Sequence, residues 1–150
     1  MIPELEAQKI TRRVARLIGL KGVPQIRIFN TKNGRAHPKH GWFSVPAWAM
    51  KAHRSFAIAF IIHELAHFGK PISYYCPTSK TRYGQDWIAH SWALRPHCRE
   101  SRQIEAKIAE KFGFRPVFRR GVYADSIRDM TGKPVCDKQG NPIAEQAAEI

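Results

Sequence analysis

Two histidines and a glutamate stand at a spacing that can hold a metal ion, in the segment His63-Glu64-Leu65-Ala66-His67. On a helix, residues four apart lie one turn apart on the same face, so both imidazoles can reach one ion. Glu64 lies about 100° around the helix from His63. From there its carboxylate can take a proton from a metal-bound water. The pattern therefore predicts a metal centre with Glu64 beside the metal.

The segment around this motif, Phe56 to Phe68, is expected to form a buried helix. It contains no Gly or Pro and is apolar almost all round. The two histidines could be ordinary residues of a core helix. A buried His, Glu, His group costs several kcal/mol unless something satisfies it, however, and a metal ion does so. Burial thus favours the metal site.

Other elements are expected on both sides of this helix. Before it we predict a helix over Pro3–Ile18, strands over Gln25–Asn30 and about Gly41–Val45, and a loop or short helical turn at Pro46–Ala49. After it we predict an irregular loop over Ile72–Arg82 and helices over Gly84–Leu94 and Pro96–Phe112. From Phe114 the chain is turn-rich, and a small hairpin or a loosely attached tail would both fit. These elements predict an α+β fold.

Length and composition narrow the class of protein. The 150 residues suit one domain over 1–150, in which 114–150 form a turn-rich extension. No apolar run is long enough to span a membrane, and the N-terminus lacks the layout of a signal peptide, so we expect a cytoplasmic protein. Cys76, Cys98 and Cys136 include no close pair and are expected to be reduced thiols.

The chain is strongly basic, with 25 Lys and Arg against 12 Asp and Glu, a formal net charge of +13. Such a balance suits a polyanionic partner, and nucleic acid is the usual one. The residues expected to form this surface lie on the outer faces of the first and last helices. They are Arg12, Arg13, Arg16, Arg99, Arg102 and Lys107. The alternative is a basic surface that only keeps the protein soluble.

The order helix, strand, strand and helix with His-Glu-Leu-Ala-His resembles small zincin-type zinc metallopeptidases, and more narrowly the SprT-like group. The resemblance runs from about Ile10 to Phe114. A second match is Tyr83-Gly84-Gln85-Asp86-Trp87, which resembles the His-Gly-x-Glu-Phe/Trp segment that supplies the third ligand in that group. The resemblance implies a zincin-like domain with a short antiparallel-type sheet beside the active-site helix. It also implies His63 and His67 as zinc ligands and Glu64 as the general base.

The match departs from the family at the third ligand, because Tyr83 stands where the family has histidine. Catalytic zinc usually has three protein ligands. We expect His90 to be the third, since it lies two turns further along the same predicted helix face. Asp86, Tyr83 and Glu100 remain as alternatives. If Tyr83 is not a ligand, it is a candidate for stabilising the oxyanion.

The function expected from these features is zinc-dependent hydrolysis of peptide bonds in a protein or peptide substrate. Larger members of the resembled group act on proteins attached to DNA, which suits the net charge. The Cys-based zinc ribbon that some of them carry is missing here. One alternative is a basic nucleic-acid-binding module with a structural or vestigial metal site. Another is a metal-dependent hydrolase of a non-peptide substrate.

Overall fold

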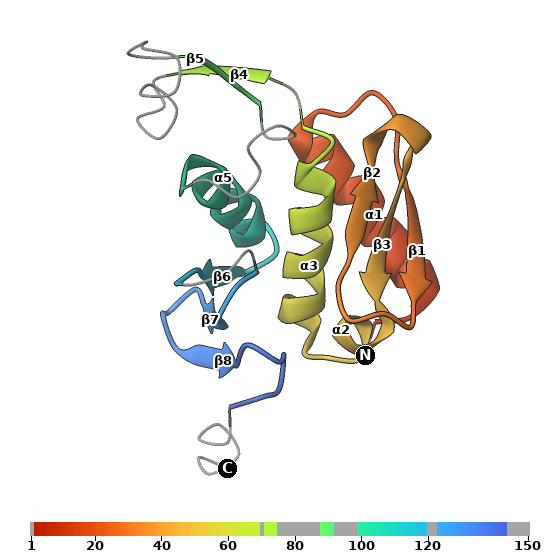
Figure 1. The fold of residues 1–150 in the computed structure, drawn as a ribbon. Coiled ribbons are helices and arrows are strands. Elements are labelled where there is room, and N and C mark those ends of the chain that lie inside the picture. Colours follow the sequence, from red (N-terminus) through yellow and green to blue (C-terminus); the bar gives the residue numbers. More distant parts are fainter. Residues whose placement is uncertain (1, 70, 75–87, 92–98, 120–122, 144–150) are drawn as a thin grey trace.

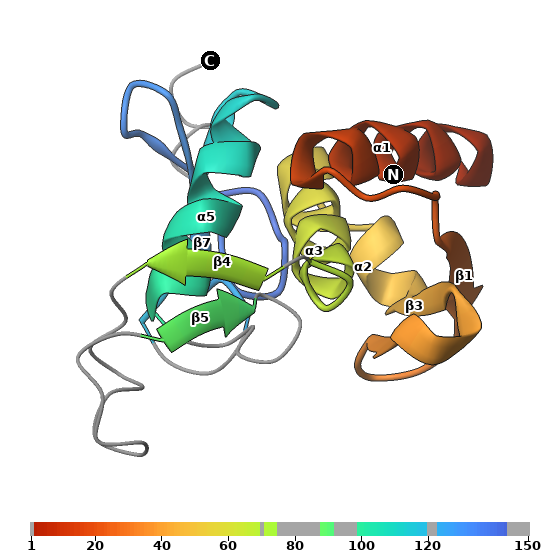
Figure 2. The same ribbon diagram turned by 90° about the horizontal axis from the view of Figure 1, so that it is seen from above.

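Helix α3 (Arg54–Ala66) stands between two groups of elements, as Figure 1 shows. The computed structural model describes residues 2–69, 71–74, 88–91, 99–119 and 123–143. One group contains α1 (Glu4–Ile18), the first sheet and α2 (Ala47–Met50). The other contains α5 (Arg99–Glu110) and a later sheet. The view from above in Figure 2 likewise places α1 and α5 on opposite sides of α3.

The first helix forms where the sequence predicts it. Pro3 precedes it in an extended conformation, and Gly19 ends it in the left-handed conformation with φ 86°. Proline suits a helix start, and glycine adopts positive φ without a steric penalty. The helix buries an apolar stripe that includes Ile10 and Val14.

The first sheet has three strands, β1 (Gln25–Phe29), β2 (Arg35–His37) and β3 (Trp42–Pro46), in the order β1-β3-β2. The predictions of β1 and β3 are confirmed, whereas β2 was not predicted. Strands β1 and β3 run parallel, and β2 pairs with β3 in the antiparallel direction, so the sheet is mixed. A single turn of 3-10 helix, Pro38–His40, connects β2 to β3. The expected short helical turn after β3 is α2.

Helix α3 is buried on nearly every side, as its apolar sequence predicts. Ten of its thirteen residues are buried. The first sheet and α1 pack against one side of it, and α5 packs against the other. The buried apolar side chains between Ile2 and Cys136, except that of Ala15, belong to one hydrophobic cluster.

After α3 the described chain forms an antiparallel pair of strands, β4 (Pro71–Tyr74) and β5 (Ile88–Ser91). The prediction of a helix over Gly84–Leu94 is therefore wrong at 88–91, and the loop predicted from Ile72 begins as a strand. The cause is a pairing between distant segments, in which Ile72 lies opposite His90. Local helix propensity contains no information about such a distant partner. Residues 75–87 and 92–98 lie outside the described residues.

The last part of the chain is an ordered sheet joined to α5, with strands β6 (Phe114–Val117), β7 (Ser126–Asp129) and β8 (Pro134–Cys136) in that order. All its described pairings are antiparallel. The hairpin alternative is thus confirmed. The turn after β8 is anchored by a hydrogen bond of 2.9 Å, which the backbone N–H of His53 donates to the carbonyl of Gly140.

The described elements comprise four α-helices and two three-stranded sheets, in addition to the β4–β5 pair. The α+β expectation is confirmed. Within the described ranges, no helix has the length and apolar character needed to cross a membrane.

Candidate metal centre

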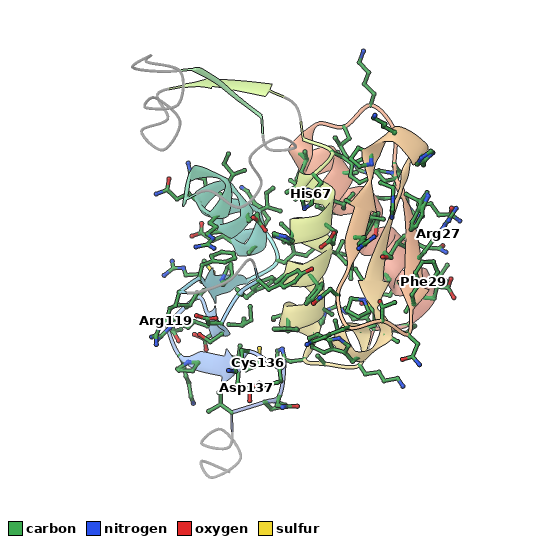
Figure 3. The ribbon with its side chains drawn as sticks, in the orientation of Figure 1. Arg27, Phe29, His67, Arg119, Cys136 and Asp137 are labelled. Atoms are coloured by element: carbon green, nitrogen blue, oxygen red, sulfur yellow. The ribbon has the colours of Figure 1, made fainter. Side chains whose placement is uncertain are left out.

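The motif on α3 brings three potential ligands together. One ligand atom each from His63, Glu64 and His67 lies within 4.8 Å of the other two. The two imidazole ring centres are 5.6 Å apart, and the rings are nearly perpendicular. His63 and Glu64 are buried, whereas His67, near the C-terminal end of α3 (Figure 3), is partly exposed.

Glu105 of α5 holds His63 from the opposite helix. Nδ1 of His63 lies 3.1 Å from Oε1 of Glu105, and both side chains are almost fully buried. With the carboxylate ionised, Nδ1 must carry the proton and donate this hydrogen bond. The imidazole is thereby fixed in the tautomer whose Nε2 has the lone pair for a metal.

Tyr123, from the segment between β6 and β7, holds the carboxylate of Glu64. Its hydroxyl donates a hydrogen bond of 3.1 Å to Oε1 of Glu64. The phenol ring stacks on Phe60 at 4.2 Å between ring centres and meets His63 edge-on at 4.9 Å. The tyrosine therefore fixes one carboxylate oxygen in place and leaves Oε2 to other partners.

Gly34, just before β2, approaches Glu64 from the first sheet. A side chain at this position would place its Cβ 2.6 Å from the carbonyl oxygen of Ser44 and 3.2 Å from the carboxyl carbon of Glu64. Only glycine lets the backbone pass so close to this carboxyl group. Glu64 is thus enclosed by elements from both sides of α3.

Burial and neighbouring charges shift the pKa values of His63, Glu64 and Glu105. Burial alone would lower the pKa of His63, but the hydrogen bond and charge of Glu105 outweigh it, so this pKa is raised. Burial raises the pKa of Glu64, although His63 and the Tyr123 hydroxyl partly offset the rise. Burial also raises the pKa of Glu105 against the opposing effect of His63. A raised pKa makes the Glu64 carboxylate a stronger base once it is ionised.

The group fits a metal ion. Oε2 of Glu64 and Oε2 of Glu105 are buried and have no hydrogen-bond partner among the described residues. A buried carboxylate oxygen without a partner is costly, and a cation nearby would offset the cost for Glu64. The imidazoles of His63 and His67 are donors that zinc accepts, and the Glu64 carboxylate lies beside them. His63, Glu64 and His67 are the described residues that could hold the ion.

A narrow apolar crevice lies beside His63. It lies between α3, α5 and the last sheet, and its lining includes Phe60, His63, Glu105, Phe118 and Tyr123. The space open to water is about 10 Å³. That volume holds about one water molecule. The crevice is too small for a substrate.

The residues predicted as third ligand are not tested by this geometry. The backbone of His90 lies in β5, and Glu100 lies in the first turn of α5, but neither side chain is among those described. Tyr83 and Asp86 lie outside the described residues. The assignment of His90, and of Tyr83 to the oxyanion, stays a prediction.

Glu105 and Tyr123 belong to the site but were not predicted from the sequence. Glu105 carries a usable signal, because Glu105, Ile108 and Phe112 share the helix-face spacing of an apolar stripe. A carboxylate on an apolar helix face calls for a buried partner. Tyr123 carries no such signal, since it lies in a turn-rich segment without periodicity.

Of the three cysteines, Cys136 is a buried free thiol, and burial beside Asp137 raises its pKa to about 12. Cys76 and Cys98 lie outside the described residues. Comparison with known proteins gives no further guidance, because no family model, curated protein or solved structure matches the chain.

Proposed function

We propose that this protein is a metal-dependent hydrolase whose centre is built on His63, Glu64 and His67, and that it is a zinc peptidase. The observation that carries the proposal is the His, Glu, His group, in which His63 and Glu64 are buried and one carboxylate oxygen lacks a partner among the described residues. The HExxH spacing, which resembles that of zincin-type peptidases, favours zinc and the peptide bond.

In this proposal the imidazoles of His63 and His67 hold the zinc, and Glu64 acts as the general base. Bound zinc supplies Lewis acidity, which activates water and polarises a carbonyl group. Oε2 of Glu64 accepts the proton from the attacking water and passes it to the leaving amine. Tyr123 keeps Oε1 of the same carboxylate fixed, so that the base needs little reorientation.

Access to the centre is expected from the end of α3 that carries His67. This is the least buried residue of the three, whereas His63 and Glu64 are each at most 3% exposed. The crevice beside His63 admits about one water molecule and no substrate group. A peptide would therefore approach from the His67 side.

The test begins with elemental analysis of protein purified without added metal, where about one zinc per chain is expected. His67→Ala should lose the zinc and lower the melting temperature, because metal binding stabilises the folded state. The matched control is His40→Ala, which removes an exposed histidine and should change neither quantity. Protein without metal, whose melting temperature does not respond to a chelator, would contradict the proposal.

The catalytic role is tested by Glu64→Gln with an unstructured protein such as casein as substrate. The amide keeps the shape of the side chain but cannot accept the proton, so hydrolysis should be lost while the fold remains. Glu4→Gln, an exposed glutamate in the first turn of α1, is the control. Near-normal hydrolysis by Glu64→Gln would exclude Glu64 as the base. Metal binding without any hydrolysis by the wild type would favour a structural metal site.

A further inference from the structure

The first sheet has an outer face that no described helix covers. Side chains alternate across a sheet, and Ile26, Phe43 and Val45 point to the core, where α1 and α3 pack. The alternate residues of the three strands lie on the opposite face, which is called here the outer sheet face. Its exposed or partly exposed members are Gln25, Arg27, Phe29, Arg35, His37 and Trp42, whereas Ser44 and Pro46 of β3, which share this face, are buried. Figure 3 shows Arg27 and Phe29 projecting at the edge of the molecule away from α3.

Flat side chains from all three strands pack together on this face. The guanidinium carbon of Arg27 lies 4.2 Å from the centre of the Trp42 ring. His37 stacks on the same indole from the strand on the other side, at 3.9 Å between ring centres and an interplanar angle of 26°. Phe29 meets Trp42 edge-on at 6.0 Å and remains 41% exposed.

The guanidinium of Arg27 is also held in position by Gln25. Its Nε and Nη2 donate hydrogen bonds of 3.3 and 3.2 Å to Oε1 of the glutamine. A planar group fixed in this way loses little conformational entropy when another planar group stacks on it. The outer sheet face is therefore preorganised for flat ligands.

The segment of the chain that contains this sheet carries charges of one sign only. From Ala7 to His63 the chain has eleven Lys and Arg residues and no Asp or Glu. Arg27 and Arg35 lie on the face itself, and Lys32 and Lys39 lie in the segments that flank β2. Such a surface attracts anions and repels cations.

We propose that the outer sheet face binds single-stranded nucleic acid. Unpaired bases stack on aromatic rings and on guanidinium planes, while lysine and arginine neutralise the phosphates between them. In a duplex the faces of the bases are stacked on one another, so they cannot stack on side chains of the protein. The combination of stacked flat groups with cations therefore favours a single strand. This activity is independent of the metal centre, which lies across the sheet on α3.

The arginines of the helices fit this role less well. Nη2 of Arg13 donates a hydrogen bond of 2.8 Å to the carbonyl of Lys111, and its guanidinium lies 4.3 Å from the centre of the Phe112 ring. Arg102 packs over Phe118 at 5.4 Å. Both therefore join parts of the fold. Arg12 and Arg16 remain exposed on α1 and offer a control of equal charge.

The experiment measures fluorescence anisotropy of a labelled oligothymidine of twelve nucleotides with the full chain across a salt series. Phe29→Ala should weaken binding about 5- to 150-fold, as loss of one stacked base does. Leu17→Ala, which trims a side chain of 42% exposure on α1, should leave it unchanged. The Arg27→Ala, Arg35→Ala double variant should reduce the slope of log affinity against log salt by about 1.4. The Arg12→Ala, Arg16→Ala double variant should leave the slope unchanged.

Four results would overturn the proposal. They are no binding at low salt, equal binding of a duplex of the same length, equal losses in the α1 variants, and displacement of the oligonucleotide by polyglutamate at the same charge concentration. Equal losses in the α1 variants would mean that binding depends only on the net charge of the protein. The fourth would indicate a surface for acidic protein segments. Melting temperatures of all variants would establish that the differences arise in folded protein.

Discussion

His63 and Glu64 are neighbours in the chain, yet different parts of the fold hold their side chains. Glu105, 42 residues later, binds the imidazole of His63. Gly34 lies against the carboxyl group of Glu64, and Tyr123 donates a hydrogen bond to it. The chemistry of each residue at the centre therefore depends on a distant contact as well as on the motif.

Replacing Glu105 tests whether it orients a metal ligand. Glu105→Leu removes the acceptor of the His63 hydrogen bond and should weaken zinc binding about 10- to 100-fold, as loss of a partner that orients a ligand does. Glu105→Gln keeps an acceptor oxygen and should retain most of the affinity. The measurement is competition with a chromophoric chelator. If the two variants bind zinc equally well, Glu105 does not act through the tautomer of His63.

The sequence predicts the part of the site that is local. Residues 63, 64 and 67 follow from helix spacing alone, because one turn of helix brings both histidines to one face. The partners of these residues depend on how α5 and the last sheet pack, and packing is not encoded in any short pattern. Glu105 could be suspected from its place on an apolar stripe, whereas Tyr123 could not.

At the scale of elements, helices with strong periodicity were predicted correctly and short strands were not. Helix α1 and helix α5 follow their apolar stripes, and α3 follows from its uniformly apolar sequence. The strands β2, β4 and β5 have three or four residues each. So short a segment has too few residues for an alternating pattern to stand out, and its partner decides its conformation.

Gly34 is a position beside the metal centre where an added methyl group should destabilise the fold. Gly34→Ala would place Cβ against the carbonyl of Ser44 and the carboxyl group of Glu64, so it should destabilise the fold by about 1–3 kcal/mol. Urea denaturation measures this change. Gly22→Ala is the control, because no atom lies within 4 Å of its Cβ. It should be neutral or stabilise by up to about 1 kcal/mol. Equal effects would mean that the backbone near Glu64 adjusts freely.

At the scale of the whole molecule, the last sheet contains two turns of similar structure, at Asp129 and at Asp137. The second of them attaches the sheet to the start of α3. Asp129 and Asp137 each accept two backbone hydrogen bonds through Oδ1, and each is followed three residues later by a glycine of positive φ. A Cβ added at Gly132, in the first turn, would meet no atom within 4 Å, whereas one added at Gly140 would meet Ala52, just before α3, and Phe56, in its first turn.

Substitutions in these two turns distinguish the cost of backbone strain from the cost of a clash between the second turn and α3. Gly132→Ala should cost about 1–2 kcal/mol, the price of a side chain in the left-handed region. Gly140→Ala should cost about 1–3 kcal/mol more, because its Cβ would also lie 2.4 Å from Cβ of Ala52. Denaturant titration of both variants gives the difference. Equal costs would show that the turn is not pressed against α3.

The position of α3 between an earlier and a later part of the chain also has a consequence for the order of events during synthesis. When the ribosome has released residues up to Ala66, the first sheet and α1 can already cover one side of the helix. Glu105 and Tyr123 have not yet emerged. At about 5–20 residues per second, the nascent chain spends about 3–11 seconds before Tyr123 follows. For that interval the motif is complete in sequence but its imidazole and carboxylate are unsupported. A newly made chain can therefore acquire a fully ordered centre only after Tyr123 has emerged.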